Sequence, residues 1–120
     1  MFGFEATLQD VAFIISDETS PWMRAYFFLL AVVLAPLFEE ILFRGILLPA
    51  LAKRFGATAS VVAVSVLFAG IHGHVPSLVP LFVLSAALCL AYIRTGSLAT
   101  NIAMHAVFNG VTVTLLFVIR

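Results

Sequence analysis

The sequence predicts an all-α protein built as a polytopic transmembrane helical bundle, with about four membrane segments and a short N-terminal amphipathic helix. Of its 120 residues, 63% are hydrophobic and only 10% are charged, and the mean hydropathy is +1.19. A soluble domain is typically about half apolar and about a quarter charged. Short polar breaks also divide the apolar sequence into segments of helical length. We therefore expect an integral, multi-pass membrane protein in contact with the lipid bilayer.

The N-terminal region, residues 1–20, precedes a predicted membrane core at residues 21–120. Apolar side chains recur at helical spacing along one side of this region: Phe4, Leu8, Val11 and Ile15. Acidic and amide side chains take the other side, which indicates a short amphipathic helix suited to the membrane surface. Ser20 is suited to an N-cap and Pro21 to the first helical position, so a new helix should begin there.

Four apolar segments follow in the core. The first, residues 22–52, would make a helix roughly 45 Å long, which exceeds the ~30 Å hydrocarbon core of a bilayer. Because Pro36 lies inside it, we expect a kink or a division into two helices at that point. The other three segments are predicted at about residues 57–72, 77–93 and 97–119. Each is near the short end for crossing a bilayer.

Six polar residues interrupt these apolar helices: Glu39, Glu40, Arg44, His72, His105 and Asn109. An ionised group at the centre of a membrane helix costs roughly 2.5 to 3.5 kcal/mol, so such residues are expected to have a function or a partner. Glu40 and Arg44 have the i,i+4 spacing of a helical ion pair, whereas Glu39 points about 140° away from Arg44. We therefore expect Glu40 and Arg44 to form a structural ion pair, and Glu39 to face another partner.

The last helix carries one polar stripe, at intervals of four, four and three residues: Asn101, His105, Asn109 and Thr112. Counted by helical rise from the basic end of the bundle, Glu39 and His72 lie roughly 20 and 23 Å deep. His105 and Asn109 lie roughly 12 to 18 Å deep, at a similar level. These four side chains are therefore expected to meet around one cavity inside the bundle.

Other conspicuous residues have structural interpretations. His74 lies in a turn at the membrane edge and is expected in solvent, and Phe68 is expected to pack beside the ring of His72. Asn101 is expected to bridge helices by hydrogen bonding. The single cysteine, Cys89, cannot form an intramolecular disulfide and is expected to be a small core or lipid-facing side chain. The net charge is zero and the basic residues are scattered, so we expect no nucleic-acid partner.

Three motifs carry a family resemblance: two glutamates with an arginine four after the second (Glu39, Glu40, Arg44), a phenylalanine four before a histidine (Phe68, His72), and a histidine four before an asparagine (His105, Asn109). In type and order they resemble the CAAX prenyl protease and bacteriocin-processing family, also called the Abi or CPBP intramembrane proteases. The resemblance covers about residues 36–110. It implies hydrolysis of a peptide or protein substrate in a membrane cavity by Glu39, His72, His105 and Asn109. It also implies a structural role for Glu40 and Arg44.

Two mechanisms fit these residues. In the preferred one, which requires no cofactor, Glu39 with His72 activates a water while His105 and Asn109 donate hydrogen bonds to the oxyanion. In the alternative, Glu39, His72 and His105 bind zinc. A transporter or proton relay is a different function, but the paired repeats common in transporters are missing from the sequence. A third possible function is that of a non-catalytic immunity or scaffold protein. The sequence retains every candidate catalytic group, which argues against this possibility.

Overall fold

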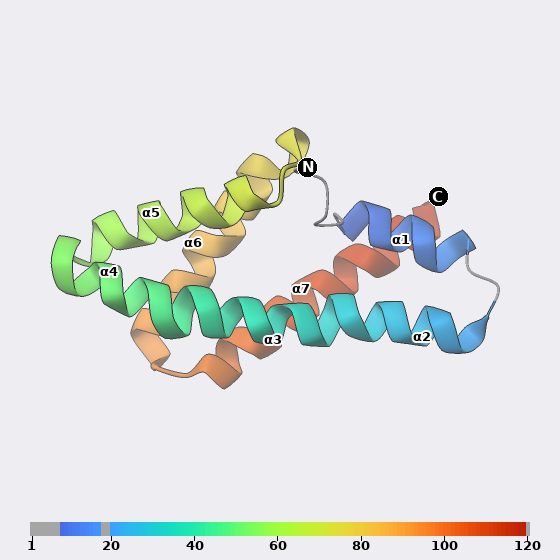
Figure 1. The fold of residues 1–120 in the computed structure, drawn as a ribbon, viewed down its shortest axis with the longest axis horizontal. Coiled ribbons are helices and arrows are strands. Elements are labelled where there is room, and N and C mark those ends of the chain that lie inside the picture. The colour runs from blue at the N-terminus through green and yellow to red at the C-terminus, as the bar shows by residue number, and fades with distance from the viewer. Residues whose placement is uncertain (1–7, 18–19, 120) are drawn as a thin grey trace.

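The computed structural model describes residues 8–17 and 20–119, and this part of the chain is a bundle of helices without a strand (Figure 1). The predicted all-α fold is confirmed. The short first helix, α1 (Leu8–Asp17), packs against the C-terminal half of the last helix through Ala12, Ile15 and Val113. The amphipathic pattern is thus used to hold α1 to the bundle. Phe4, which belonged to the same pattern, lies outside the described residues.

One continuous helix extends over Pro21–Phe55. It consists of α2 (Pro21–Leu29), the π-helical turn η1 (Leu30–Leu34), α3 (Ala35–Glu40), a second π-helical stretch η2 (Ile41–Leu47) and α4 (Leu48–Phe55). Its start is as predicted, because the Ser20 side chain accepts a hydrogen bond from the Met23 N–H and Pro21 is the first helical residue. The helix does not divide in two at Pro36. Instead, Pro36 follows η1, where the Ala35 N–H donates five residues back to the Leu30 carbonyl.

The remaining helices lie within about two residues of their predicted positions. They are α5 (Ala57–Ile71), the 3₁₀ turn η3 (Val75–Ser77), α6 (Leu78–Thr95) and α7 (Leu98–Ile119). In the described part of the chain, three helices are long and apolar enough to cross a membrane: Pro21–Phe55, Val75–Thr95 and Leu98–Ile119. The fourth expected segment, α5, is a shorter apolar helix of 15 residues, or about 22 Å.

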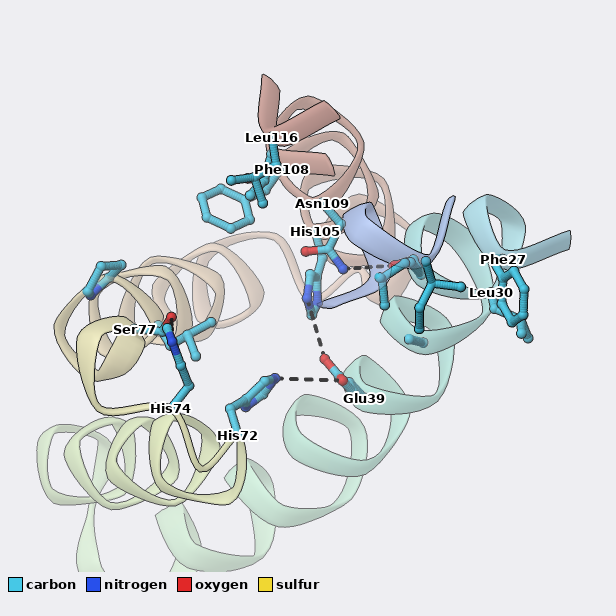
Figure 2. Close-up of a pocket in the computed structure, with 17 residues that line it drawn as sticks. Phe27, Leu30, Glu39, His72, His74, Ser77, His105, Phe108, Asn109 and Leu116 are labelled. Atoms are coloured by element: carbon cyan, nitrogen blue, oxygen red, sulfur yellow. Dashed lines mark hydrogen bonds and ion pairs between the residues drawn. The ribbon is translucent and has the colours of Figure 1, made fainter. Parts of the chain in front are cut away.

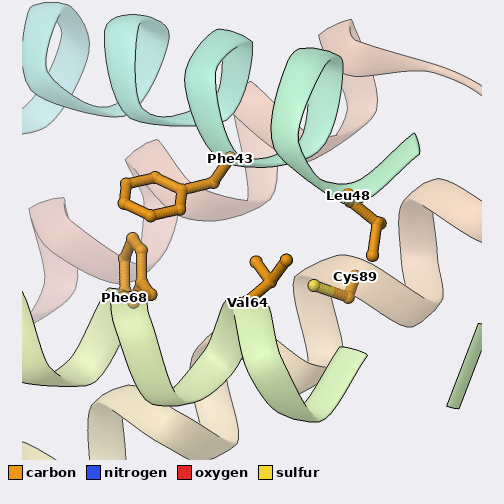
Figure 3. Packing of buried hydrophobic residues seen from close by; sticks show 5 residues of the cluster. All are labelled: Phe43, Leu48, Val64, Phe68 and Cys89. Atoms are coloured by element: carbon orange, nitrogen blue, oxygen red, sulfur yellow. The ribbon is translucent and has the colours of Figure 1, made fainter. Parts of the chain in front are cut away.

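A buried apolar cluster holds the first long helix, α5 and α6 together (Figure 3). Its members are Phe43, Leu48, Val64, Phe68 and Cys89. The rings of Phe43 and Phe68 meet edge to face, with centroids 5.2 Å apart. Between helices in lipid, close packing of this kind stabilises the contact through dispersion. Phe43 is one turn after Glu39 and Phe68 one turn before His72, so their contact also sets the register of those two polar residues.

Candidate active site

Glu39, at the end of α3, lies between two histidines from two other parts of the bundle (Figure 2). Its Oε1 atom is 3.9 Å from Nε2 of His72, which follows α5, and its Oε2 atom is 3.4 Å from Nε2 of His105 in α7. The Glu39 side chain is 27% exposed, so a water or a substrate can reach the carboxylate. Three of the four residues that were expected at one depth therefore do meet.

A cavity of about 520 Å³ opens beside this carboxylate. All four predicted site residues line it: Glu39, His72, His105 and Asn109. The other walls are mainly apolar and come from α1, the first long helix, α6 and α7, for example Ile14, Phe27, Leu30, Leu81 and Leu116. A few convergent polar groups on the wall of an apolar cavity of this size are typical of a ligand-binding site.

The amide of Asn109 ties α7 to the first long helix at the cavity. Its Nδ2 donates a hydrogen bond of 2.9 Å to the backbone carbonyl of Ala31. In an α-helical pattern that carbonyl would accept from Ala35, but the Ala35 N–H donates to Leu30. In a π-helical pattern the Ala31 carbonyl would accept from the N–H of residue 36, but residue 36 is a proline and has no N–H. Pro36 and η1 thus make a carbonyl available, and Asn109 supplies its donor.

Glu40 and Arg44 form the predicted ion pair. Arg44 Nη1 lies 3.1 Å from Glu40 Oε1, and both side chains are fully buried. Arg44 also reaches α6, where its Nη2 donates to the carbonyl and hydroxyl oxygens of Ser85 at 3.0 and 2.6 Å. The pair therefore links the first long helix to α6 and keeps two charges partnered inside the bundle.

Glu40 has two further partners on α7, which the helical-face argument did not predict. Asn101 Nδ2 donates to Glu40 Oε2 at 3.1 Å, and Nδ1 of His105 lies 2.7 Å from Glu40 Oε1. His105 thus contacts Glu39 through Nε2 and Glu40 through Nδ1. The two glutamates point in different directions, as expected, but one imidazole ring connects them.

Phe68 packs against this polar cluster on the side that faces the buried apolar core. Its ring centroid lies 4.8 Å from that of His72, which confirms the predicted contact, and 5.8 Å from that of His105. The guanidinium carbon of Arg44 lies 4.8 Å from the same ring centroid, within the range of a cation–π interaction. One buried phenylalanine therefore contacts three of the polar side chains and limits their movement.

The structure places His74 differently from the expectation. His74, expected in solvent, is instead half-buried on the cavity wall, where its Nδ1 lies 2.6 Å from Ser77 Oγ. Within residues 8–17 and 20–119, no group of three or more His, Cys, Asp and Glu side chains is arranged to hold a metal ion.

Asn101 acts as the helix bridge that the sequence indicated, since its Nδ2 also donates to the Leu88 carbonyl at 2.8 Å. Interhelical hydrogen bonds in membranes are worth about 0.6 kcal/mol on average and about 1.7 at most, so Asn101→Ala should lower the unfolding free energy by about 1 to 2 kcal/mol. Unfolding in mixed micelles measures this. Thr114→Ala is the control, because that exposed hydroxyl donates a hydrogen bond to the Gly110 carbonyl within α7. Equal stability of the two variants would contradict a bridging role.

Residues 21–111 match the profile of a family described as type II CAAX prenyl endopeptidase Rce1-like. The match covers more than half of the chain and contains the whole polar cluster around Glu39, while α1 lies outside it. No curated protein and no solved structure gives a significant match.

Proposed function

Because the chain belongs to the Rce1-like family of type II CAAX prenyl endopeptidases, we propose that it hydrolyses peptide bonds of membrane-associated or prenylated proteins or peptides. The family makes it a protease that meets a peptide or protein substrate at a lipid bilayer. In the described part of the chain, three helices are of spanning length, which makes it an integral, multi-pass membrane protein. The observation that carries the proposal is the Glu39 carboxylate, which contacts His72 and His105 on the wall of a cavity.

In the proposed reaction, Glu39 is the general base. A water held by Glu39 and His72 attacks the carbonyl carbon of the substrate, and one of its protons passes to the Glu39 carboxylate. The partial exposure of Glu39 to the cavity supports this role. The carbonyl π electrons move to oxygen, which becomes the negative oxygen of a tetrahedral intermediate.

His105 and Asn109 are the proposed donors to that oxygen. Nε2 of His105 lies 3.4 Å from Glu39 Oε2, so it can receive the proton that Glu39 took from water. The resulting N–H then donates a hydrogen bond to the oxyanion. When the C–N bond breaks, the C=O bond re-forms and that proton moves to the leaving nitrogen, so the products are a carboxylic acid, which keeps the second proton of the water, and an amine. Fixed donors stabilise developing charge strongly in a site with little water. Both groups are held by hydrogen-bond partners in the bundle, His105 by Glu40 and Asn109 by the Ala31 carbonyl.

The apolar part of the cavity supports a substrate with an apolar segment beside the cleaved bond. Its walls include Phe27, Leu30 and Leu116, away from the glutamate. Incubating the purified protein with prenylated and unprenylated membrane peptides, and identifying both products by mass, tests the proposal. An intact substrate after prolonged incubation would contradict it.

The zinc-dependent version of the same protease is the second candidate, because Glu39 lies within 4 Å of Nε2 of both His72 and His105, although these groups are not arranged as a metal-binding set in the described residues. We propose the metal-free version and expect cleavage to survive exhaustive chelation, with no stoichiometric zinc in the purified protein. Rates before and after chelation, together with elemental analysis, measure this. Loss of cleavage that added Zn²⁺ restores would replace the proposed mechanism, and Glu39, His72 and His105 would then be ligands.

A further inference from the structure

Glu40 lies on the far side of His105 from the cavity. The carboxylate is fully buried and is absent from the residues that line the cavity, so it does not touch a substrate bound there. Its 2.7 Å contact with Nδ1 is nevertheless the shortest polar contact of the His105 ring. Burial and a short contact on the outer ring atom are the features of a group that orients a catalytic imidazole.

The other partners of Glu40 determine where the hydrogen lies in this contact. Both oxygens already accept hydrogen bonds, from Arg44 Nη1 and from Asn101 Nδ2. An ionised carboxylate has no hydrogen to give. The hydrogen between Glu40 and His105 must therefore belong to Nδ1. A neutral imidazole carries one hydrogen, so Nε2 then presents its lone pair toward Glu39.

We infer that Glu40 is a positioning residue of the reaction, which sets the tautomer and orientation of His105 in addition to pairing with Arg44. The kinetic part of this inference rests on the proposed function. With hydrogen on Nδ1, the Nε2 atom can take the proton from Glu39 and pass it to the leaving nitrogen. With hydrogen on Nε2 alone, an N–H faces Glu39 and no lone pair receives the proton, so the transfer stops.

The simpler alternative is that Glu40 only neutralises Arg44. The two roles give opposite results once Arg44 is removed. In an Arg44→Met background, Glu40→Gln removes a buried charge that has lost its cation, so both roles predict better folding. If Glu40 only balances Arg44, turnover should recover along with folding. If Glu40 positions His105, turnover should fall, because an amide can donate to Nδ1 and favour the other tautomer.

The experiment compares Arg44→Met with the double variant Arg44→Met, Glu40→Gln in detergent, using a peptide that the wild type cleaves. We expect the double variant to be at least as stable, with kcat lower by about 100-fold or more and KM nearly unchanged. An equal or higher kcat in the double variant would overturn the inference while leaving the proposed function intact.

A second measurement decides the matter even if these variants fold poorly or the wild type cleaves nothing. In protein labelled with ¹⁵N-histidine, the His105 signals are identified by their loss in His105→Asn. We expect a protonated Nδ1 in the wild type. A His105 protonated only at Nε2 would overturn the role of Glu40, whereas an inactive wild type with protonated Nδ1 would overturn only the proposed function.

Discussion

Glu39→Gln should abolish peptide cleavage and leave the protein folded. Glutamine has nearly the shape of glutamate and can keep polar contacts with His72 and His105, but its amide does not take a proton from water. General bases contribute about 10²- to 10⁴-fold to rate, so we expect turnover to fall by a factor in that range. Turnover per folded molecule, with folding followed by gel filtration in detergent, measures the effect.

The matched control is Asp10→Asn, which makes the same acid-to-amide change on the exposed side of α1. That side chain is not among those lining the cavity, so turnover should stay at the wild-type level. Full turnover by Glu39→Gln, with the control also active, would show that another group is the base.

Glu40→Gln should destabilise the fold, in addition to its effect on His105. It leaves the Arg44 guanidinium charged in a fully buried position, and breaking a buried ion pair by removing one partner costs about 3 to 5 kcal/mol. The midpoint and slope of unfolding in mixed micelles give this value. A second change, Arg44→Met, should recover part of the loss because it removes the unpaired charge. Wild-type stability in Glu40→Gln alone would contradict the role of the pair.

The contact between Glu40 and His105 changes how activity data on the two glutamates are interpreted. From helical spacing alone, a folded but inactive Glu40→Gln would indicate that Glu40 is the base. Since Nδ1 of His105 lies 2.7 Å from Glu40, the same variant is expected to lose activity through the imidazole. The turnover of Glu39→Gln therefore identifies the general base, because the contacts of Glu40 with His105 and Arg44 remain in that variant.

Local signals in the sequence predicted much of the fold. The Ser20–Pro21 cap and the apolar segments predicted the helix boundaries to within about three residues. The sequence left a kink or a division of the first long helix open at Pro36, and the structure shows one continuous helix. A proline removes one hydrogen bond and would commonly bend or end a helix, but here η1 changes the bonding pattern and Asn109 occupies the carbonyl that is left. That compensation comes from a residue far along the chain.

The sequence predicted which four polar residues meet at the cavity, but not every partner that holds them in place. The Glu40–Arg44 pair follows from i,i+4 spacing, which local geometry determines. The contacts of Ser85, Asn101 and His105 depend on how α6 and α7 are rotated about their axes. The polar stripe of α7 indicated which face of that helix turns inward, whereas α6 is apolar on nearly every side, so periodicity alone did not indicate that Ser85 faces Arg44.

The central claim is that Glu39 activates a water for hydrolysis of a peptide bond in the membrane. The most direct test incubates purified wild type and Glu39→Gln side by side with one membrane peptide substrate and follows product masses over time. We expect two fragments from the wild type, whose summed mass exceeds that of the substrate by one water, and essentially none from Glu39→Gln. No fragments from the wild type, or equal rates from both proteins, would contradict it.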